Sequence, residues 1–157
     1  MAIKSYQGRQ AAPEKPEGTP MLVKDYMTTD LITFRETDNI MDVAEKLLQH
    51  RISGGCVVDE KNNLIGMISE GDCMKHVSDS QYYNMPLEDT TVGKRMNCNV
   101  ETIDGDMNVI DAAKKFIEKR YRRFPIVENG KLVGQISQSD VLRVATKQKS
   151  NNWHDKT

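Results

Sequence analysis

The strongest constraint on this chain is an internal repeat, because a segment that occurs twice is expected to fold the same way twice. When the sequence is compared with itself at an offset of 69 residues, Val23 meets Val92 and Thr33 meets Thr102. After Asp59 the offset becomes 68, since the turn that follows is one residue longer in the first copy. The chain therefore contains two similar units of about 55 residues each.

The repeats divide the 157 residues into five parts. The first twenty residues hold three prolines among polar side chains, and such a segment cannot bury enough surface to offset its ordering entropy. The last twelve residues are polar apart from Trp153. We therefore expect a flexible arm (1–20), repeat one (21–77), a connector (78–90), repeat two (91–145) and a polar tail (146–157).

Each repeat shows the order β-α-β-β-α. Residues 40–48 and 109–117 place apolar side chains at i, i+3, i+4, i+7 and i+8, as in a helix with one buried face. Thr37 and Asp106 are predicted to cap these two helices. The Asn-Gly pair at 129–130 predicts a hairpin turn. We expect strands at 31–34, 56–58 and 64–69, and at 100–103, 124–127 and 132–137, with a closing helix beginning near Ser69 and near Ser137.

The fold class that follows is α/β, of the α+β kind, built from two β-α-β-β-α repeats. Neither repeat alone buries much core, because a sheet of two or three strands needs covering to be stable. We expect the repeats to pack on each other about a pseudo-twofold axis. Such packing makes a cleft at their interface, and small-molecule sites favour clefts of this kind.

Composition excludes several classes of protein. Lys and Arg number 22 against 23 Asp and Glu, so the chain is not a uniformly basic nucleic-acid binder. No apolar run reaches the roughly 18–20 residues of a membrane helix, and no secretory signal is evident. The cysteines Cys56, Cys73 and Cys98 form no Cys-x-x-Cys pair, which indicates reduced thiols. We expect a cytoplasmic protein without metal or membrane contact.

Two motifs resemble a known family. The segment GMISEGD at 66–72 recurs as GQISQSD at 134–140, and both are similar to the signature of the cystathionine-β-synthase (CBS) domain. The segments RISGGCVVD at 51–59 and VKDYMT at 23–28 also resemble that family. The resemblance covers about 120 residues and is that of a stand-alone tandem CBS pair, or Bateman module.

The resemblance implies an adenosyl ligand: AMP, ADP, ATP or S-adenosylmethionine, with no obligatory cofactor. In the family, the motif Asp accepts hydrogen bonds from the ribose, and the motif Ser or Thr meets ribose or phosphate. Carried over by position, one site would use Thr33, Ser53, Ser69 and Asp72, and the other would use Thr102, Arg122, Arg123, Pro125, Ser137 and Asp140.

The same residues also have a purely structural interpretation. Ser-x-x-Asp before a helix is close to a capping box, which satisfies free backbone N–H groups. The two interpretations are compatible, because a helix N-terminus also attracts phosphate.

The two copies differ in the charge and shape of their predicted sites. Arg122 and Arg123 belong to a basic cluster at 114–123, which favours the second copy as the phosphate site. In the first copy, Gly54 and Gly55 would permit a ligand to approach the backbone closely, and Cys56 stands where the family usually has Pro.

The functional prediction is a regulatory energy or metabolite sensor that binds an adenosyl ligand between the repeats. A homodimer and a further protein target are expected. The alternative is a ligand-independent dimerisation or assembly module. None of the histidines joins a catalytic or metal-binding motif, so no enzyme is expected, and the acidic middle of the chain argues against nucleic acid.

Overall fold

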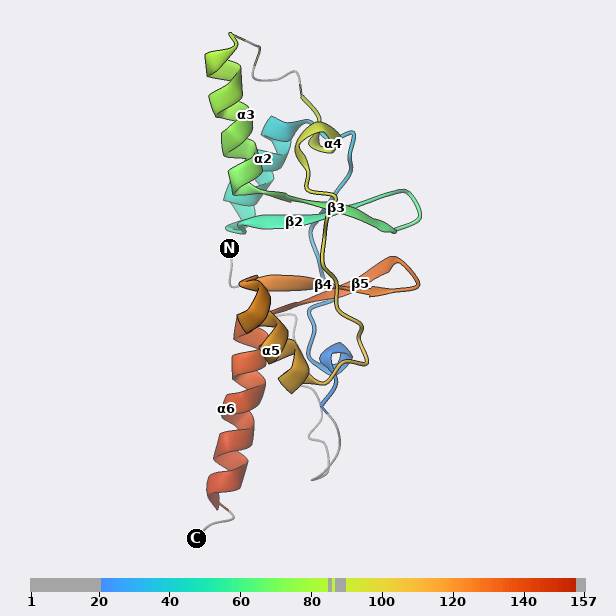
Figure 1. The fold of residues 1–157 in the computed structure, drawn as a ribbon, viewed down its shortest axis with the longest axis vertical. Coiled ribbons are helices and arrows are strands. Elements are labelled where there is room, and N and C mark those ends of the chain that lie inside the picture. The colour runs from blue at the N-terminus through green and yellow to red at the C-terminus, as the bar shows by residue number, and fades with distance from the viewer. Residues whose placement is uncertain (1–20, 85, 87–89, 155–157) are drawn as a thin grey trace. The chain divides into compact units, whose positions relative to one another are not determined.

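The computed structural model describes residues 21–84, 86 and 90–154 (Figure 1). The predicted arm, the Trp153 side chain and part of the connector lie outside the described residues. The elements are η1 (Val23–Asp25), β1 (Thr33–Phe34), α2 (Ile40–His50), β2 (Gly54–Val58), β3 (Leu64–Ser69), α3 (Glu70–Tyr82), α4 (Val92–Arg95), α5 (Val109–Lys119), β4 (Arg123–Glu128), β5 (Lys131–Ser137) and α6 (Gln138–His154).

The predicted α+β class is confirmed, and the first repeat has the predicted order β-α-β-β-α. In the first repeat β1 runs parallel to β2, with Thr33 opposite Cys56, and β2 runs antiparallel to β3. In the second repeat β4 and β5 form a two-stranded sheet. The strand expected at 100–103 is reduced to one parallel bridge, between Ile103 and Ile126. The turn between β4 and β5 has positive φ at both Asn129 and Gly130, as the Asn-Gly pair predicted.

The compact units of the structure are not the repeats of the sequence. The first unit comprises Ile32–Val100 and Gly130–Leu132, whereas residues 21–31 belong to the second unit with most of 101–154. Each repeat thus gives its opening segment to the other unit. Thr28 and Gln135 exchange backbone hydrogen bonds in the second unit, at 2.8 and 2.9 Å.

Each unit has its own apolar core, and the exchanged segments enter these cores. Val23 of η1 is fully buried with Ile103, Phe116 and the other core side chains of the second unit. Its repeat counterpart Val92 is fully buried with the core of the first unit. Since the two valines occupy equivalent positions, the exchange is reciprocal.

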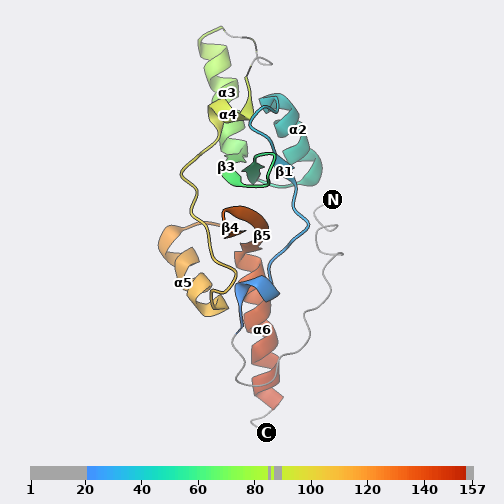
Figure 2. The same ribbon diagram turned by 90° about the vertical axis from the view of Figure 1, so that its right-hand side faces the viewer.

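The helices of each unit lie on one side of its sheet. Figures 1 and 2 place α2 and α3 together beside β1–β3, and they place α5 and α6 together beside β4 and β5. Within each pair the two helices pack against each other. One face of each helix therefore meets its own core, and another face points away from it.

The predicted caps of α2 and α5 were wrong by two residues. The N-caps are Asn39 and Asn108, whose side-chain Oδ1 atoms accept hydrogen bonds from the Met41 and Ile110 N–H groups, each at 2.8 Å. Asparagine reaches the free N–H groups as well as the predicted residues would. Asp106 is instead paired with Lys24 at 2.8 Å.

Two helices are longer than the sequence indicated. α3 continues to Tyr82, into the predicted connector, and α6 continues to His154, through most of the predicted tail. Residues 146–154 contain no Gly or Pro to end the helix. Within the described residues, no helix combines the length and the apolar character needed to cross a membrane.

Candidate functional site

The first candidate site is the corner where β3 meets α3. Ser69 is the N-cap of α3, and its Oγ accepts a hydrogen bond from the Asp72 N–H at 3.2 Å. Asp72 Oδ2 accepts hydrogen bonds from the Ser69 N–H and Oγ–H, both at 2.9 Å. The capping box predicted from the sequence is therefore present. Asp72 Oδ1 has no hydrogen bond or ion pair with the described residues.

The second corner, where β5 meets α6, repeats this arrangement with one addition. Asp140 Oδ2 accepts a hydrogen bond from the Ser137 N–H at 2.8 Å, and Ser137 Oγ accepts one from the Asp140 N–H at 3.2 Å. Asp140 Oδ1 forms an ion pair with Arg143 Nη1 at 2.9 Å. The Asp140 side chain is only 3% exposed, so this carboxylate is held inside the fold.

A third backbone group joins each corner. The N–H of Glu70, the first residue of α3, donates to the Ser53 carbonyl at 2.8 Å. The N–H of Gln138, the first residue of α6, donates to the Arg122 carbonyl at 3.1 Å. The chain just before β2, and likewise the chain just before β4, therefore lies at the N-terminus of the closing helix of its repeat. The structure brings Ser53 together with Ser69 and Asp72, and Arg122 together with Ser137 and Asp140.

The remaining predicted residues lie on or beside strands β1 and β4. Thr33 lies in β1 opposite Cys56, without a hydrogen bond of its own to the Ser69–Asp72 corner among the described residues. Ile103, which follows Thr102, donates its N–H to the Pro125 carbonyl at 3.0 Å, so Thr102 lies near the start of β4. Arg123 begins β4 and is half-buried.

Gly54 and Gly55 of the first repeat allow the chain to pack closely on itself. A Cβ atom at Gly55 would lie 2.6 Å from the Phe34 ring, and one at Gly54 would lie 2.8 Å from the Ile68 carbonyl oxygen. The space in the Cβ direction of both residues is thus filled by the chain itself, whereas close backbone approach by a ligand stays a prediction. Cys56 is buried, as expected of a small apolar residue.

The basic cluster at 114–123 is partly neutralised by a residue that sequence reasoning missed. Glu101 forms ion pairs with Lys115 at 3.2 Å and with Lys119 at 3.7 Å. Lys115 also donates to the Thr102 carbonyl at 3.1 Å and lies 5.5 Å from the centre of the Phe124 ring. Arg122 is exposed, so it is better placed than Lys115 to meet a ligand.

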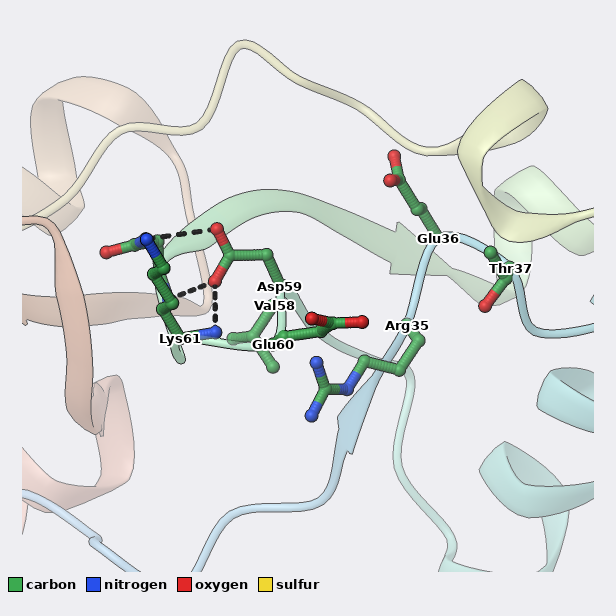
Figure 3. Close-up of a pocket in the computed structure, with 8 residues that line it drawn as sticks. Arg35, Glu36, Thr37, Val58, Asp59, Glu60 and Lys61 are labelled. Carbon is green, nitrogen blue, oxygen red and sulfur yellow. Dashed lines mark hydrogen bonds between the residues drawn. The ribbon is translucent and has the colours of Figure 1, made fainter.

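A pocket of about 680 Å³ lies elsewhere in the first unit (Figure 3). Residues 35–37, 58–61 and 63 line it, and none of the predicted ligand residues is among them. Asp59 accepts hydrogen bonds from the Lys61 and Asn63 N–H groups, both at 2.9 Å. These bonds, led by the one from the Asn63 side chain at 3.0 Å, hold the pKa of Asp59 below its usual value. The carboxylate thus closes the turn after β2.

The Cys73 thiol and the His76 imidazole are buried in the first unit. Burial raises the pKa of the Cys73 thiol, which disfavours the reactive thiolate. His76 is buried, and the Ser80 hydroxyl, 3.5 Å from its Nε2, donates to the His76 carbonyl at 2.7 Å. Among the described residues, no three His, Cys, Asp or Glu side chains gather as metal ligands would.

Comparison with protein families gives one assignment. The family described as CBS domain matches this chain twice, at residues 23–79 and 91–147. Both matched segments contain one of the capped corners.

Two relatives are similar in sequence. Uncharacterised protein MK0525 of Methanopyrus kandleri is 36% identical over 116 residues, which is 73% of this chain and 58% of that protein. The chloroplastic CBS domain-containing protein CBSX1 of Arabidopsis thaliana is 30% identical over 156 residues, which is 83% of this chain and 66% of that protein. The chain thus spans less than two thirds of the length of these relatives.

Two solved structures are similar in fold. CBSX2 of Arabidopsis thaliana in complex with AMP has a TM-score of 0.72 and 27% identity, covering 82% of this chain and 98% of that one. The CBS domain pair of protein MJ0100, in complex with methylthioadenosine and S-adenosyl-L-methionine, has a TM-score of 0.66 and 27% identity. It covers 83% of this chain and 99% of the other.

Proposed function

The chain belongs to the CBS-domain family as a tandem pair, and from this premise we propose that it is a regulatory protein that binds an adenosyl ligand at its capped corners. One observation carries the proposal. In both units a serine, an aspartate and the carbonyl of a preceding segment meet at the N-terminus of the closing helix. Two neighbours in fold bind AMP, or methylthioadenosine and S-adenosylmethionine, in their crystals.

Each corner offers an acceptor for a ribose hydroxyl and a helix N-terminus for a phosphate. Asp72 Oδ1 is a free acceptor for a ribose hydroxyl in the first unit. In the second unit, Asp140 Oδ1 can accept from a hydroxyl beside its bond to Arg143, since a carboxylate oxygen has two lone pairs. Helix N-termini favour anions, so a ligand phosphate suits either corner.

The cations favour the second corner for a phosphorylated ligand. Arg122 is exposed, and its own carbonyl is hydrogen-bonded to the first residue of α6. The Arg122 backbone therefore lies beside the helix N-terminus, and from there its side chain can reach a phosphate. In this proposal Arg122 and Arg123 bind the ligand phosphate and Asp140 binds the ribose. The other residues of this site are Thr102, Pro125 and Ser137. In the first unit, Thr33, Ser53, Ser69 and Asp72 form the corresponding set.

The wider function follows as a proposal. Ligand binding would change the equilibrium between two arrangements of a homodimer and thereby alter the activity of a target protein. The ligand can shift this equilibrium by no more than the difference between its affinities for the two arrangements. Such a protein acts in the cytoplasm as an energy or metabolite sensor without catalysis.

Calorimetric titration with AMP, ATP and S-adenosylmethionine tests the proposal. Asp140→Ala should weaken binding of the preferred ligand by about tenfold or more, because a hydrogen bond to a charged group contributes about 1.5–3 kcal/mol. Arg122→Ala tests the same corner without removing a buried group, and it should weaken ATP binding most. Asp106→Asn, on an exposed ion pair of the same unit, is the matched control and should bind as the wild type does. Unchanged affinity in both corner variants would contradict the assignment.

A ligand-independent assembly module is the second candidate. The capping boxes and the ion pair of Asp140 with Arg143 favour it, because they give the motif residues a complete structural role. A thermal-shift screen with AMP, ATP, NAD and S-adenosylmethionine separates the two functions. A ligand at 100 times its Kd should stabilise the protein by about 2.7 kcal/mol. No shift with any of the four would favour assembly.

A further inference from the structure

The pocket of the first unit lies at the end of the sheet opposite to the capped corner. Since β1 and β2 run parallel, the segments that follow them, 35–37 and 59–61, leave the sheet at the same end and line the pocket together (Figure 3). β3 runs antiparallel to β2 and ends at Ser69, opposite Gly54, the first residue of β2. The pocket is therefore separate from the residues proposed to bind an adenosyl ligand, and it needs its own explanation.

Charged side chains of both signs line the pocket without partners in the described part of the chain. Arg35, Glu36 and Glu60 are exposed, and none of their side chains forms an ion pair or a hydrogen bond with a described residue. Figure 3 shows the Arg35 and Glu60 side chains extending toward one another. Asp59 differs, because its carboxylate accepts three hydrogen bonds from the turn that it closes. One guanidinium and two carboxylates are thus available to a ligand.

The second unit fills the equivalent place with its own chain. The Lys24 N–H donates to the Gly105 carbonyl at 2.9 Å, and Lys24 Nζ pairs with Asp106 at 2.8 Å. In the first unit the repeat counterpart of Lys24 is Gly93, which donates its N–H to the Glu36 carbonyl at 2.8 Å. The backbone contact is the same, but glycine brings no ammonium group. The first unit therefore presents the carboxylate of Glu36 beside a position from which the second unit extends a cation.

We propose that this pocket binds a free α-amino acid, whose carboxylate pairs with Arg35 and whose ammonium group pairs with Glu36. Arginine binds carboxylates through two parallel hydrogen bonds, so it suits this end of the ligand. A purely anionic ligand would be repelled by Glu36 and Glu60, and a purely cationic one by Arg35, whereas a zwitterion satisfies both charges. The volume of about 680 Å³ is within the usual range for small-molecule sites. This inference goes beyond the adenosyl ligand and does not depend on it.

Calorimetric titration of the whole chain with each standard L-amino acid tests the ligand class. At least one amino acid should bind. Its N-acetyl derivative and its carboxamide should each bind about tenfold more weakly or worse, because each lacks one of the two charges. If no amino acid binds, or if the N-acetyl derivative binds as tightly as its parent, the pocket is not a site for a zwitterion.

Substitutions in the pocket lining test the location. Arg35→Gln and Glu36→Gln should each weaken binding of the same amino acid by about tenfold or more, and the fold should persist because both residues are exposed. Arg51→Gln, at an exposed arginine that caps the other end of α2, is the matched control and should bind as the wild type does. Amino-acid binding that survives both pocket variants would overturn the assignment. AMP affinity, measured on the same proteins, should stay unchanged, so the two sites can fail separately.

A substitution copied from the second unit sharpens the test. Gly93→Lys would bring beside Glu36 the side chain that Lys24 provides in the second unit, so it should weaken amino-acid binding by competing with the ligand ammonium. Gly93→Ala controls for crowding, because a Cβ at this position would lie 3.2 Å from the Glu36 carbonyl oxygen and 3.3 Å from the Glu36 Cβ. Equal affinities in these two variants would show that no ligand ammonium lies beside Glu36, and would overturn the proposed orientation.

Discussion

The two units build the same corner between strand and helix, and they differ in what holds the carboxylate. Asp140 is buried and paired with Arg143, whereas Asp72 is half-buried and has Lys75 at the equivalent position, with no ion pair between Asp72 and Lys75 among the described residues. The same motif therefore lies deeper in the structure in the second unit and is more accessible in the first. A capping box can secure a helix and still present acceptor atoms to a ligand.

Substitution of the glycine that opens each motif, Gly66 or Gly134, is expected to have the largest effect on stability. A Cβ at Gly134 would lie 2.5 Å from Met27 Sδ and 3.0 Å from the Thr28 carbonyl oxygen, and one at Gly66 would lie 2.8 Å from Met96 Sδ. Gly134→Ala should therefore destabilise the protein by about 1–3 kcal/mol through overpacking. Urea unfolding measures it. Gly66→Ala should cost less, since its contacts are longer, and the opposite order would contradict this comparison of the units.

Removing the ion pair of the second corner has the next largest effect. Arg143→Ala should lower the free energy of unfolding by about 1–2 kcal/mol, because it removes an ion pair from a buried carboxylate while the arginine itself is partly exposed. Lys75→Ala, the matched change in the first unit, should cost almost nothing. Equal losses of unfolding free energy in the two variants, measured by chemical unfolding, would show that the ion pair of Asp140 with Arg143 does not stabilise the second corner.

The smallest effect concerns the turns of the two hairpins and depends on pH. Asp59 holds the turn after β2, while its counterpart Glu128 precedes the Asn129-Gly130 turn. The hydrogen bonds from Asn63 lower the pKa of Asp59 in the folded protein. The stability that the Asp59 carboxylate contributes is therefore fully present above the pKa of the unfolded chain, and it is lost as the pH falls through the lower folded pKa.

Asp59→Asn should therefore reduce stability slightly at neutral pH. The effect should be smaller near about pH 3, which lies below the usual pKa of Asp. Thermal unfolding at both pH values measures the difference. A constant difference between the two proteins would contradict a role for the charged carboxylate.

Local patterns predicted most of the fold. The helical spacing of apolar residues located α2 and α5, and Ser-x-x-Asp located the starts of α3 and α6, because a cap and a buried face act within a few residues. The N-caps were misplaced because Thr37 and Asn39 both suit that role, and only the backbone around Asn39 decides between them.

Long-range choices could not be predicted. Val23 and Val92 are the same residue at equivalent repeat positions, so nothing local indicates that each belongs to the core of the other unit. The pairing of Glu101 with two lysines likewise depends on how separate segments meet. Arg143 could have been found, since it lies three residues after Asp140 on one helix, where side chains are neighbours.

The most direct test of the central claim is a map of backbone amide shifts on titration with AMP. Binding at the capped corners predicts that the largest changes occur at residues 69–72 or 137–140 and at the carbonyl-bearing segments 53–54 or 122–123. Asp72→Asn and Asp140→Asn should each remove the changes at their own corner. Changes centred on the pocket at 35–37 and 58–63, or no changes at saturating AMP, would contradict the account.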